Sequence, residues 1–529
     1  MKLHRALLAL SALLLFTACP EQGLLCPEGQ VACGQGAAAT CQEFRSDPSN
    51  CGGCQVACSD GQACVEGSCR CQPGATFSEG ACVFTAFDAD NCGTPGTVCG
   101  ADSVCSDGAC VSACPASTTR CGRSCVDLAD NDVHCGACDD ACASATSCHA
   151  GACEYDVVAA CSTNGQLVGM QAGSDLLGPT RAVGTNRPMA LAPLREVILV
   201  PDVDQVMTQA RQSDLVSVGT TVGVGTDARF LITEDPFVYV VNSVSGTLQI
   251  FEAGGASDGG YDLALRAELP LSETDQGNTY AQGVAKSGNT LYIPLQGGFG
   301  AAAAEGQKVL RVNVSDPALP VREGAIDLTS VALQSFDGGV TLPRPADAVV
   351  HRGALYVALT NLDKSYAPGG PGILAKVELA TGNVTAITLD SNVCLAPTEL
   401  VSSGEKLLVS CLGKVEYSWT HPYPIVKAEK SGLVVLDGND APLANWTPGG
   451  CQDGNDAGCL LAVPSRFAVL GDDVYLGDQN GGRMFVLELR PDGGIVERRG
   501  FRATSGPLQA CPVDPQLQVS NLIDVLAVP

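Results

Sequence analysis

RFLITEDPFVYVVNSVSGTLQIFEAG, residues 229–254, combines an apolar run, a tight polar turn and a second apolar run centred on Tyr239. Branched and aromatic side chains alternate with smaller or polar ones along these runs. This alternation favours β-strands over helices, and the Gly and Asp residues of the turns support the same choice. The stretch therefore predicts a strand-turn-strand unit of antiparallel sheet.

The same pattern recurs through the C-terminal part of the chain. Six units can be laid in phase, with second strands centred on Ile198, Tyr239, Tyr292, Tyr356, Leu408 and Tyr475. Successive centres lie 41, 53, 64, 52 and 67 residues apart, so the period is loose but sustained. Cysteine becomes sparse after Cys153, and about 370 residues follow. That length is ordinary for a β-propeller and too great for one small sandwich.

One unit carries a resemblance to a known class. Its segments YVVNS, from Tyr239, and GTLQIF, from Gly246, resemble the YVTN class of β-propellers, which includes surface-layer and lactonase-like proteins. The resemblance implies a propeller over residues 157–529. Two segments are not part of the six units: residues 165–183 and the strand 522–528. Propellers commonly build one blade from both chain ends, and these two segments could form such a blade. We therefore expect an all-β fold with seven blades, with six or eight as open alternatives.

The propeller segment contains six cysteines, which we expect to pair. The expected bonds are Cys161 with Cys511 in the composite blade, Cys394 with Cys411 in a hairpin, and Cys451 with Cys459 across a loop. A ring closed in this way has no exposed sheet edges, which suits a protein outside the reach of cytoplasmic chaperones.

Residues 26–153 contain one pattern of cysteine spacing that is repeated three times. Gaps of nine, two, three, five and four residues separate Cys41, Cys51, Cys54, Cys58, Cys64 and Cys69. The same gaps separate Cys125, Cys135, Cys138, Cys142, Cys148 and Cys153. The middle unit has Pro95 where the third of these six cysteines would stand. The units hold eight, six and eight cysteines, so each can close on itself as a disulfide scaffold.

The middle unit lacks the two positions occupied by Cys33 and Cys54 in the first unit and by Cys121 and Cys138 in the third. Loss of both positions is what deletion of one bond would produce. We therefore predict the disulfides Cys33–Cys54 and Cys121–Cys138, while the spacing leaves the other pairs open. Zinc is the alternative, because both C-x-x-C segments have knuckle spacing and two histidines lie nearby. Even counts and a unit that survives without C-x-x-C favour disulfides, so no metal or cofactor is expected.

The amino-acid sequences of two of these units also resemble a known family. DPSNCGGCQVACSDGQACVEGSC, ending at Cys69, and CGRSCVDLADNDVHCGACDDACASATSCHAGAC, ending at Cys153, resemble the repeats of the stigma-specific protein family. The resemblance covers about a quarter of the chain. It implies an extracellular stalk or adhesion-like module without an enzymatic role, and the missing pair of the middle unit is a departure from it.

The N-terminus resembles that of bacterial lipoproteins. A basic start precedes an apolar run, Ala6 to Phe16, that is shorter than the roughly 20 residues of a spanning helix. Leu15 to Cys19 resembles a lipobox, which implies a signal peptide at 1–18, lipidation of Cys19 and a tether at 19–25. The residues after Cys19 lack the aspartate that retains such proteins at the inner membrane, so an outer-membrane or cell-surface location is expected. An ordinary cleaved signal peptide is the alternative.

The chain is acidic, with 57 Asp and Glu against 30 Lys and Arg, which makes nucleic acid an unsuitable partner. Seven polar residues precede the second-strand centres by nine to twelve positions. In a propeller, side chains at such positions face the central channel. The seven residues are Arg187, Arg229, Gln282, Arg344, Asp347, Glu399 and Arg466. Four arginines there would form a positive mouth for a carboxylate or other anion. The alternative is that each arginine pairs with a neighbouring Asp or Glu for structural reasons.

Three functions follow from these observations. The leading hypothesis is a surface-tethered, monomeric binding or scaffold protein, in which the repeats form a stalk and the propeller binds a surface protein, a glycan or a small anion. The second is a lactonase-like or metal-dependent hydrolase, although the sequence offers no catalytic residues. The third is a structural envelope protein. Acidic turns such as 437–440 and 453–456 lack the glutamate that completes a calcium loop, so we interpret them as solvated turns.

Overall fold

The structure is a computed structural model whose described residues form strands and turns but no helix. These residues are 30–34, 40–43, 49–59, 62–65, 68–71, 74–143, 145–163, 165–174, 176–184, 186–272, 279–297, 306–363, 366–417, 425–448, 463–479, 481–491, 493–497, 508–512 and 521–528. A helix long and apolar enough to cross a membrane is not found in these ranges. The chain divides into two compact units, Met1–Arg70 and Cys71–Pro529. Cys19, Cys451 and Cys459 lie outside the described residues.

The first unit contains the first cysteine repeat. Its strands are β1 (Gln30–Cys33) with β2 (Thr40–Glu43), and β3 (Gln62–Val65) with β4 (Ser68–Cys71). Its described disulfides are Cys33–Cys54, Cys51–Cys64 and Cys58–Cys69. Large apolar side chains are scarce here, so the covalent bonds supply much of the stability.

The second unit begins with the other two repeats, which form short hairpins. Their strands are β5 (Thr76–Ser78), β6 (Ala81–Val83), β7 (Val104–Ser106), β8 (Ala109–Val111), β9 (Thr119–Cys121), β10 (Ser124–Val126), β11 (Ser147–His149) and β12 (Ala152–Glu154). Strands β7 and β10 pair in parallel, so the two repeats share one sheet with the order β8-β7-β10-β9.

The disulfide pattern is shared by the three cysteine repeats. One bond spans 13 residues in all three repeats: Cys51–Cys64, Cys92–Cys105 and Cys135–Cys148. Another spans 11 residues: Cys58–Cys69, Cys99–Cys110 and Cys142–Cys153. The second and third repeats also contain Cys71–Cys82 and Cys114–Cys125, and the third contains Cys121–Cys138. The two bonds predicted from the missing pair, Cys33–Cys54 and Cys121–Cys138, are both present. Cysteine sulfurs that come close enough to share a metal are taken up in these disulfides, so they offer no thiolate to zinc.

Glycine is required at one equivalent position of the second and third repeats. Gly93 and Gly136 have φ angles of 78° and 74°, in the left-handed region that L side chains rarely adopt. A Cβ at Gly93 would lie 2.5 Å from the carbonyl oxygen of Gly108, and a Cβ at Gly136 would lie 2.6 Å from that of Gly151. The glycine that follows the buried cysteine thus lets two loops of each repeat approach each other.

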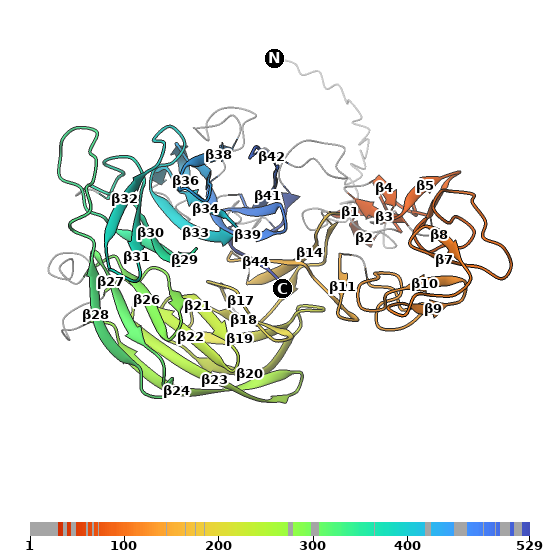
Figure 1. Ribbon diagram of the computed structural model, residues 1–529, viewed down its shortest axis with the longest axis horizontal. Helices are drawn as coiled ribbons and strands as arrows, with labels where there is room; N and C mark the ends of the chain where they lie inside the picture. The colour runs from red at the N-terminus through yellow and green to blue at the C-terminus, as the bar shows by residue number, and fades with distance from the viewer. Residues whose placement is uncertain are drawn as a thin grey trace, which may run out of the picture. The chain divides into compact units, whose positions relative to one another are not determined.

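Residues 157–527 form the propeller. Seven sheets of four or five strands follow one another along its described residues, and Figure 1 shows them arranged around a common centre. The first sheet joins both ends of this segment, because β44 (Leu522–Ala527) pairs antiparallel with β13 (Val157–Cys161). Its other strands are β14 (Gln166–Gln171), β15 (Leu176–Leu177) and β16 (Arg181–Ala182).

The next four sheets are antiparallel and run in sequence order. Their strands are β17 (Ala192–Leu194), β18 (Val197–Pro201), β19 (Val206–Arg211) and β20 (Ser217–Gly223); β21 (Ala228–Glu234), β22 (Phe237–Asn242), β23 (Thr247–Ser257) and β24 (Gly260–Pro270); β25 (Ala285–Ser287), β26 (Thr290–Leu295), β27 (Lys308–Asn313) and β28 (Val321–Asp327); β29 (Pro345–His351), β30 (Ala354–Leu359), β31 (Ile373–Glu378) and β32 (Val384–Thr388).

The last two sheets carry additions. The sixth contains β33 (Pro397–Ser403), β34 (Lys406–Cys411), β37 (Gly432–Leu436) and β38 (Pro442–Trp446), with a separate hairpin of β35 (Lys414–Tyr417) and β36 (Ile425–Glu429) inserted after β34. The seventh contains β39 (Pro464–Leu470), β40 (Asp473–Asp478), β41 (Arg483–Leu489) and β42 (Ile495–Glu497), with β43 (Leu508–Gln509) paired to β41.

The strand-turn-strand units predicted from the sequence are the first two strands of six of these sheets. In the unit at residues 229–254, Ile232 of β21 faces Tyr239 of β22, and Tyr239 in turn faces Ile250 of β23. All six predicted centres are buried. The alternation therefore identified the strands that carry most of the core.

Apolar clusters lie between neighbouring sheets. One cluster joins Tyr239 and Ile250 to Ile293 and Leu310 of the following sheet, and others join each later pair. The ring closes where β13, β14 and β44 pack against Tyr475 and the rest of the seventh sheet. Disulfide Cys161–Cys511 lies in this closing cluster, and Cys394–Cys411 lies in the sixth sheet. Both bonds join the cysteines that the sequence analysis paired.

Hydrogen bonds connect the third repeat to the first propeller sheet. Gln171 Nε2 donates to Asp132 Oδ2 at 3.0 Å and to the carbonyl oxygen of Thr146 at 3.2 Å. The Asp156 carboxylate accepts from the Ala172 amide at 2.6 Å and from the Ser147 hydroxyl at 2.7 Å. The cysteine spacing and composition predict a boundary between repeats and propeller at residues 154–156, and these hydrogen bonds cross that point. The division into two compact units falls between Arg70 and Cys71.

Candidate functional site

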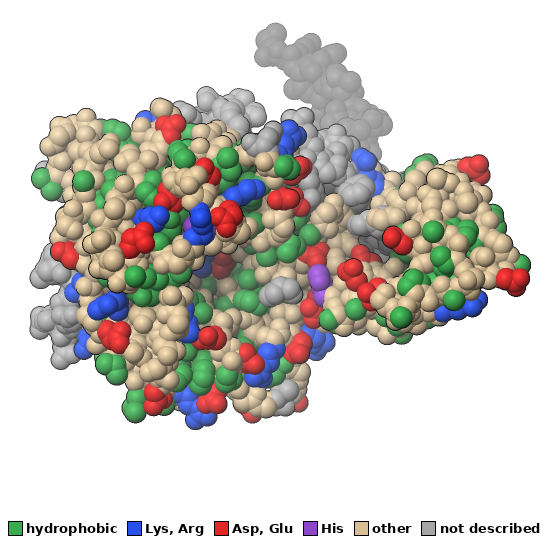
Figure 2. Space-filling view, in the orientation of Figure 1, with side chains coloured by type: hydrophobic (Ala, Val, Ile, Leu, Met, Phe, Trp, Pro, Cys, Tyr) green, Lys and Arg blue, Asp and Glu red, His purple; other side chains and the backbone are tan. Residues whose placement is uncertain are grey.

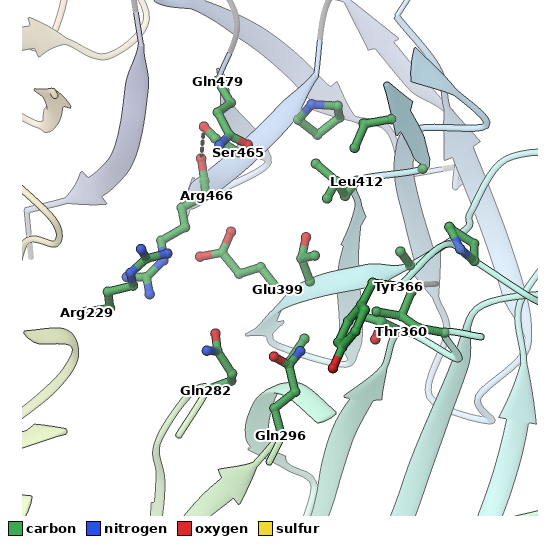
Figure 3. A pocket seen from close by; sticks show the side chains of 18 of the residues that line it. Arg229, Gln282, Gln296, Thr360, Tyr366, Glu399, Leu412, Ser465, Arg466 and Gln479 are labelled. Carbon is green, nitrogen blue, oxygen red and sulfur yellow. Dashed lines mark hydrogen bonds between the residues drawn. The ribbon is translucent and has the colours of Figure 1, made fainter. Parts of the chain in front are cut away.

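The propeller contains a cavity of about 620 Å³ at its centre, within the size range of small-molecule sites. Its charged and amide lining comes from different sheets: Arg229 from β21, Glu399 from β33, Arg466 from β39, and Gln282 and Gln296 from positions just before and after strands β25 and β26 of the fourth sheet. Figure 3 shows these side chains pointing into a common space. The innermost strands of a propeller converge on its axis, which is why residues far apart in sequence meet here.

Arg466 is the most constrained cation of the site. Its Nη1 lies 3.3 Å from Asp524 Oδ2, and its guanidinium carbon lies 4.7 Å from the centroid of the Phe230 ring. Burial alone would lower the pKa of Arg466, but the carboxylates of Asp524, Glu399 and Asp347 outweigh burial and raise it. Arg466 therefore stays charged at every pH at which the protein is folded.

Three carboxylates tie consecutive sheets together around Arg466. Asp347 Oδ2 accepts from the Leu400 amide at 2.8 Å, and Glu399 Oε2 accepts from the Phe467 amide at 2.9 Å. Asp524 Oδ2 accepts from the Leu191 amide at 2.7 Å, which links the closing sheet to the second sheet. In each case a carboxylate near the axis holds the backbone of the following sheet. We refer to Asp347, Glu399 and Asp524 as the bridging carboxylates.

Burial controls the protonation of the bridging carboxylates. It raises the pKa of Asp347 to about 6, against smaller opposite effects of the Leu400 amide and Arg466. Burial also raises the pKa of Glu399 well above its usual range, and the neighbouring Asp524 and Asp347 add to this effect. The pKa of Asp524 is raised by burial as well, although Arg466 opposes the rise. Burial thus shifts all three carboxyls toward their protonated forms.

The expected positive mouth of four arginines is reduced to two. Arg229, Gln282, Glu399 and Arg466 line the cavity, whereas Asp347 is not among its lining residues and instead accepts the Leu400 amide. The side chain of buried Arg344, which has a φ of 49°, donates to the Gly297 carbonyl at 3.1 Å and to the Tyr366 hydroxyl at 3.0 Å. Exposed Arg187 precedes the isolated bridge of Pro188 with Asp202 and does not line the cavity either.

The lining nevertheless has an excess of positive charge. Arg229, Lys414 and Arg466 contribute cations, and Glu399 contributes the only acidic side chain among the described lining residues. Arg229 pairs with Asp227 at 2.6 Å, but 44% of its side chain remains exposed. On the outer face shown in Figure 2, by contrast, acidic and basic side chains are interspersed. The side chains that line the cavity thus include more cations than carboxylates, and Asp227 and Asp524 outside the lining pair with two of these cations.

Several lining residues were missed by the sequence analysis. Lys414 belongs to the hairpin inserted in the sixth sheet, and Tyr366 belongs to the loop after β30. Asp524, which lies next to the lining, could have been recognised as a candidate from the sequence, because it is an acidic residue inside the apolar strand LIDVLA. A charge in a closing strand indicates a partner near the axis, and that partner is Arg466.

A second polar cluster lies outside the cavity lining and joins the fifth and sixth sheets. His351 Nδ1 lies 2.8 Å from Ser402 Oγ, and burial, followed by nearby Arg352, lowers the pKa of this histidine. Asp440 accepts from the Tyr356 hydroxyl at 2.6 Å and from Lys376 Nζ at 2.7 Å. The acidic turn 437–440 thus binds an ammonium group of its own chain. Turn 453–456 lies outside the described residues.

Comparisons with known proteins find separate likenesses for the two parts of the chain. Residues 107–156 match the Stigma-specific STIG1-like protein family. No curated protein matches the chain. Similar solved structures include a putative 6-phosphogluconolactonase from Bacteroides fragilis, at 11% identity and a TM-score of 0.48 over 71% of this chain and 98% of that one. AztD from Citrobacter koseri has 11% identity and a TM-score of 0.42 over 73% and 99%. The WD40 domain of Neurospora crassa Pan2 has 11% identity and a TM-score of 0.38 over 63% and 86%.

The chain is accordingly an all-β protein with a disulfide-rich N-terminal part and a propeller-like remainder. Its many disulfides indicate an exported or extracellular protein, because such bonds persist in oxidising compartments. This combination fits a binding or scaffold role.

Proposed function

We propose that this chain is an exported binding protein whose seven-bladed propeller binds a small anionic ligand in its central cavity. The observation that carries the proposal is the charge of the lining, where Arg229, Lys414 and Arg466 face one carboxyl group, Glu399. Burial raises the pKa of that carboxyl well above its usual range. The cavity therefore favours an anion in spite of the acidic chain around it.

A hydrolase is less well supported by this geometry. The bridging carboxylates, which are the natural candidates for a general base, each accept a backbone N–H from the next sheet. Their hydrogen bonds and their positions at the sheet junctions account for them as structural groups. Of the lining cations, Arg466 is held by the bridging carboxylates. Arg229 keeps 44% of its side chain exposed beside Asp227, and Lys414 lies on an inserted hairpin, so these two are better placed to meet a ligand.

Isothermal titration calorimetry of the full chain tests the proposal, with succinate, glucuronate and inorganic phosphate as probes. Arg229→Gln should weaken binding of the active probe roughly ten-fold or more, as expected for the loss of a charged hydrogen bond. Arg266→Gln is the matched control: Arg266 pairs with Glu252 at 2.6 Å and is 48% exposed, but it lies outside the cavity lining. Saturable binding that the Arg229 variant leaves unchanged would contradict the proposal, as would the failure of all probes to bind.

We also propose that the protein is tethered to the outer membrane by a lipid on Cys19. The proposal rests on the lipobox-like segment ending at that residue and on the export implied by the disulfides. In a bacterial host, metabolic labelling with a fatty acid should modify the wild-type chain. Cys19→Ala should abolish the label and move the protein from the membrane fraction to the soluble one. Labelling that survives this substitution would rule out Cys19 as the anchor.

A further inference from the structure

The polar groups of the cavity are arranged in two regions. Arg229 and Arg466 lie side by side in one region, and the Tyr366 ring with Thr360 lies in the other (Figure 3). Gln282 and Gln296 project into the space between the two regions. A ligand in this cavity therefore meets cations at one end and amide, hydroxyl and aromatic groups over the rest of its length.

The cationic region is suited to one carboxylate. Arg466 already shares its charge with Asp524, and Phe230 covers one face of its guanidinium group. Arg229 keeps much of its side chain accessible. Two neighbouring guanidinium groups can together supply parallel N–H donors to the two oxygens of a single carboxylate.

The remaining groups are suited to hydroxyls. An amide side chain such as Gln282 or Gln296 offers both donors and an acceptor, and a protonated Glu399 would do the same. Thr360 and Thr398 add hydroxyls to the lining. Sulfate only accepts hydrogen bonds, and phosphate near neutral pH has few O–H donors, so both would leave most of these acceptors unused. A sugar hydroxyl both donates and accepts, and it can satisfy both kinds of group.

The Tyr366 ring adds an apolar surface to this polar lining. Its face is covered on one side by the Arg344 guanidinium, 4.6 Å from the ring centroid, and 41% of the residue is exposed. An aromatic side chain held in place in this way can pack against the C–H face of a sugar ring. The volume of about 620 Å³ is also larger than a simple inorganic anion requires.

We infer that the ligand of the central cavity is an acidic sugar, with its carboxylate bound by Arg229 and Arg466, its hydroxyls bound by Gln282, Gln296 and Glu399, and its ring packed against Tyr366. This inference rests on the proposed anion-binding function and specifies the class of the anion. Two sources share this chemistry: a free uronic acid and the end of an acidic polysaccharide.

Calorimetry of the full chain with matched probes tests the inference. Glucuronate should bind at least ten-fold more tightly than glucose, which lacks the carboxylate, and at least ten-fold more tightly than succinate, which lacks the ring and its hydroxyls. Gln296→Leu keeps the size of the side chain but removes its hydrogen bonds, so it should weaken glucuronate about ten-fold and leave succinate unchanged. Gln334→Leu, at an exposed position outside the lining, is the control and should bind as the wild type does.

The outcomes separate the inference from the proposed function. If succinate or phosphate binds as tightly as glucuronate and the Gln296 variant behaves as the wild type, the acidic sugar is wrong and anion binding stands. If no probe binds, both fail. A galacturonate oligosaccharide that binds where the monosaccharides do not supports the inference and identifies a polysaccharide end. Preference for the monosaccharide supports it and identifies a free sugar acid.

Discussion

The pKa of Asp347 makes a quantitative prediction about stability. Its folded-state pKa of about 6 lies above the ordinary value of 3.8, so the native state binds the proton more tightly than the unfolded chain does. The stabilisation that comes from this proton is complete below pH 4 and is lost as pH rises through 6. A shift of about two units corresponds to about 3 kcal/mol. Asp347→Asn keeps an acceptor for the Leu400 amide without the charge, so it should be about 3 kcal/mol more stable than wild type at pH 7 and equal to it near pH 4.

Urea unfolding of both proteins between pH 4 and pH 7 measures this difference. Tryptophan fluorescence reports on the propeller, because Trp446 of the sixth sheet packs edge-on against Phe485 of the seventh at 4.9 Å. Asp337→Asn provides a control without pH dependence in this range. The Gly339 amide lowers the pKa of Asp337 below its usual 3.8, so its contribution to stability is already present above pH 4 and the difference from wild type should stay nearly constant up to pH 7. A difference between Asp347→Asn and wild type that stays constant from pH 4 to pH 7 would refute the assignment of a buried, proton-linked carboxylate.

Three further predictions concern charge and covalent bonds. Arg466→Gln should cost on the order of 3 kcal/mol at pH 7, as measured by urea unfolding, because it leaves the bridging carboxylates without their cation; the cost should shrink toward pH 4. Replacing Cys161 and Cys511 by Ser should lower stability by about 3–5 kcal/mol in the same assay, since the bond closes a loop of 350 residues. Replacing Cys121 and Cys138 by Ser should leave the other three bonds of the third repeat intact in a mass-spectrometric disulfide map, because the second repeat folds without this bond.

The propeller strands could be predicted because their signal is local. Each second strand alternates around a buried centre such as Tyr239 or Tyr475, and the pleat of a sheet produces this alternation directly. The bonds Cys33–Cys54 and Cys121–Cys138 could be predicted from the sequence for a different reason. A disulfide involves two positions at once, so its loss from one repeat removes both cysteines together and marks them as partners.

The cavity could be predicted only in part, because its lining depends on how the sheets meet. The distance of a residue from the second-strand centre predicts that Arg229 and Arg466 reach the cavity, and both line it. The same rule also selects Arg344, which does not line it. The left-handed backbone at Arg344 and its contact with Tyr366 are properties of the folded loop, and the sequence period does not contain them. Lys414 lies on an insertion, which has no equivalent in the other units and so falls outside any repeat-based rule.

The bridging carboxylates explain why the two arginines of the cavity have different roles. Each carboxylate has to be desolvated in order to hold the backbone of the next sheet, and Arg466 offsets that cost for three of them. Its charge is therefore largely neutralised before any ligand arrives. Arg229 pairs with the largely buried Asp227, but its own side chain is nearly half accessible, so it can reach a ligand while it keeps that ion pair. A substitution at Arg466 should thus affect folding first and binding second, and one at Arg229 should affect binding with little effect on folding. Removal of both arginines together would merge the two effects, so the single Arg229 variant is the more informative test of ligand binding.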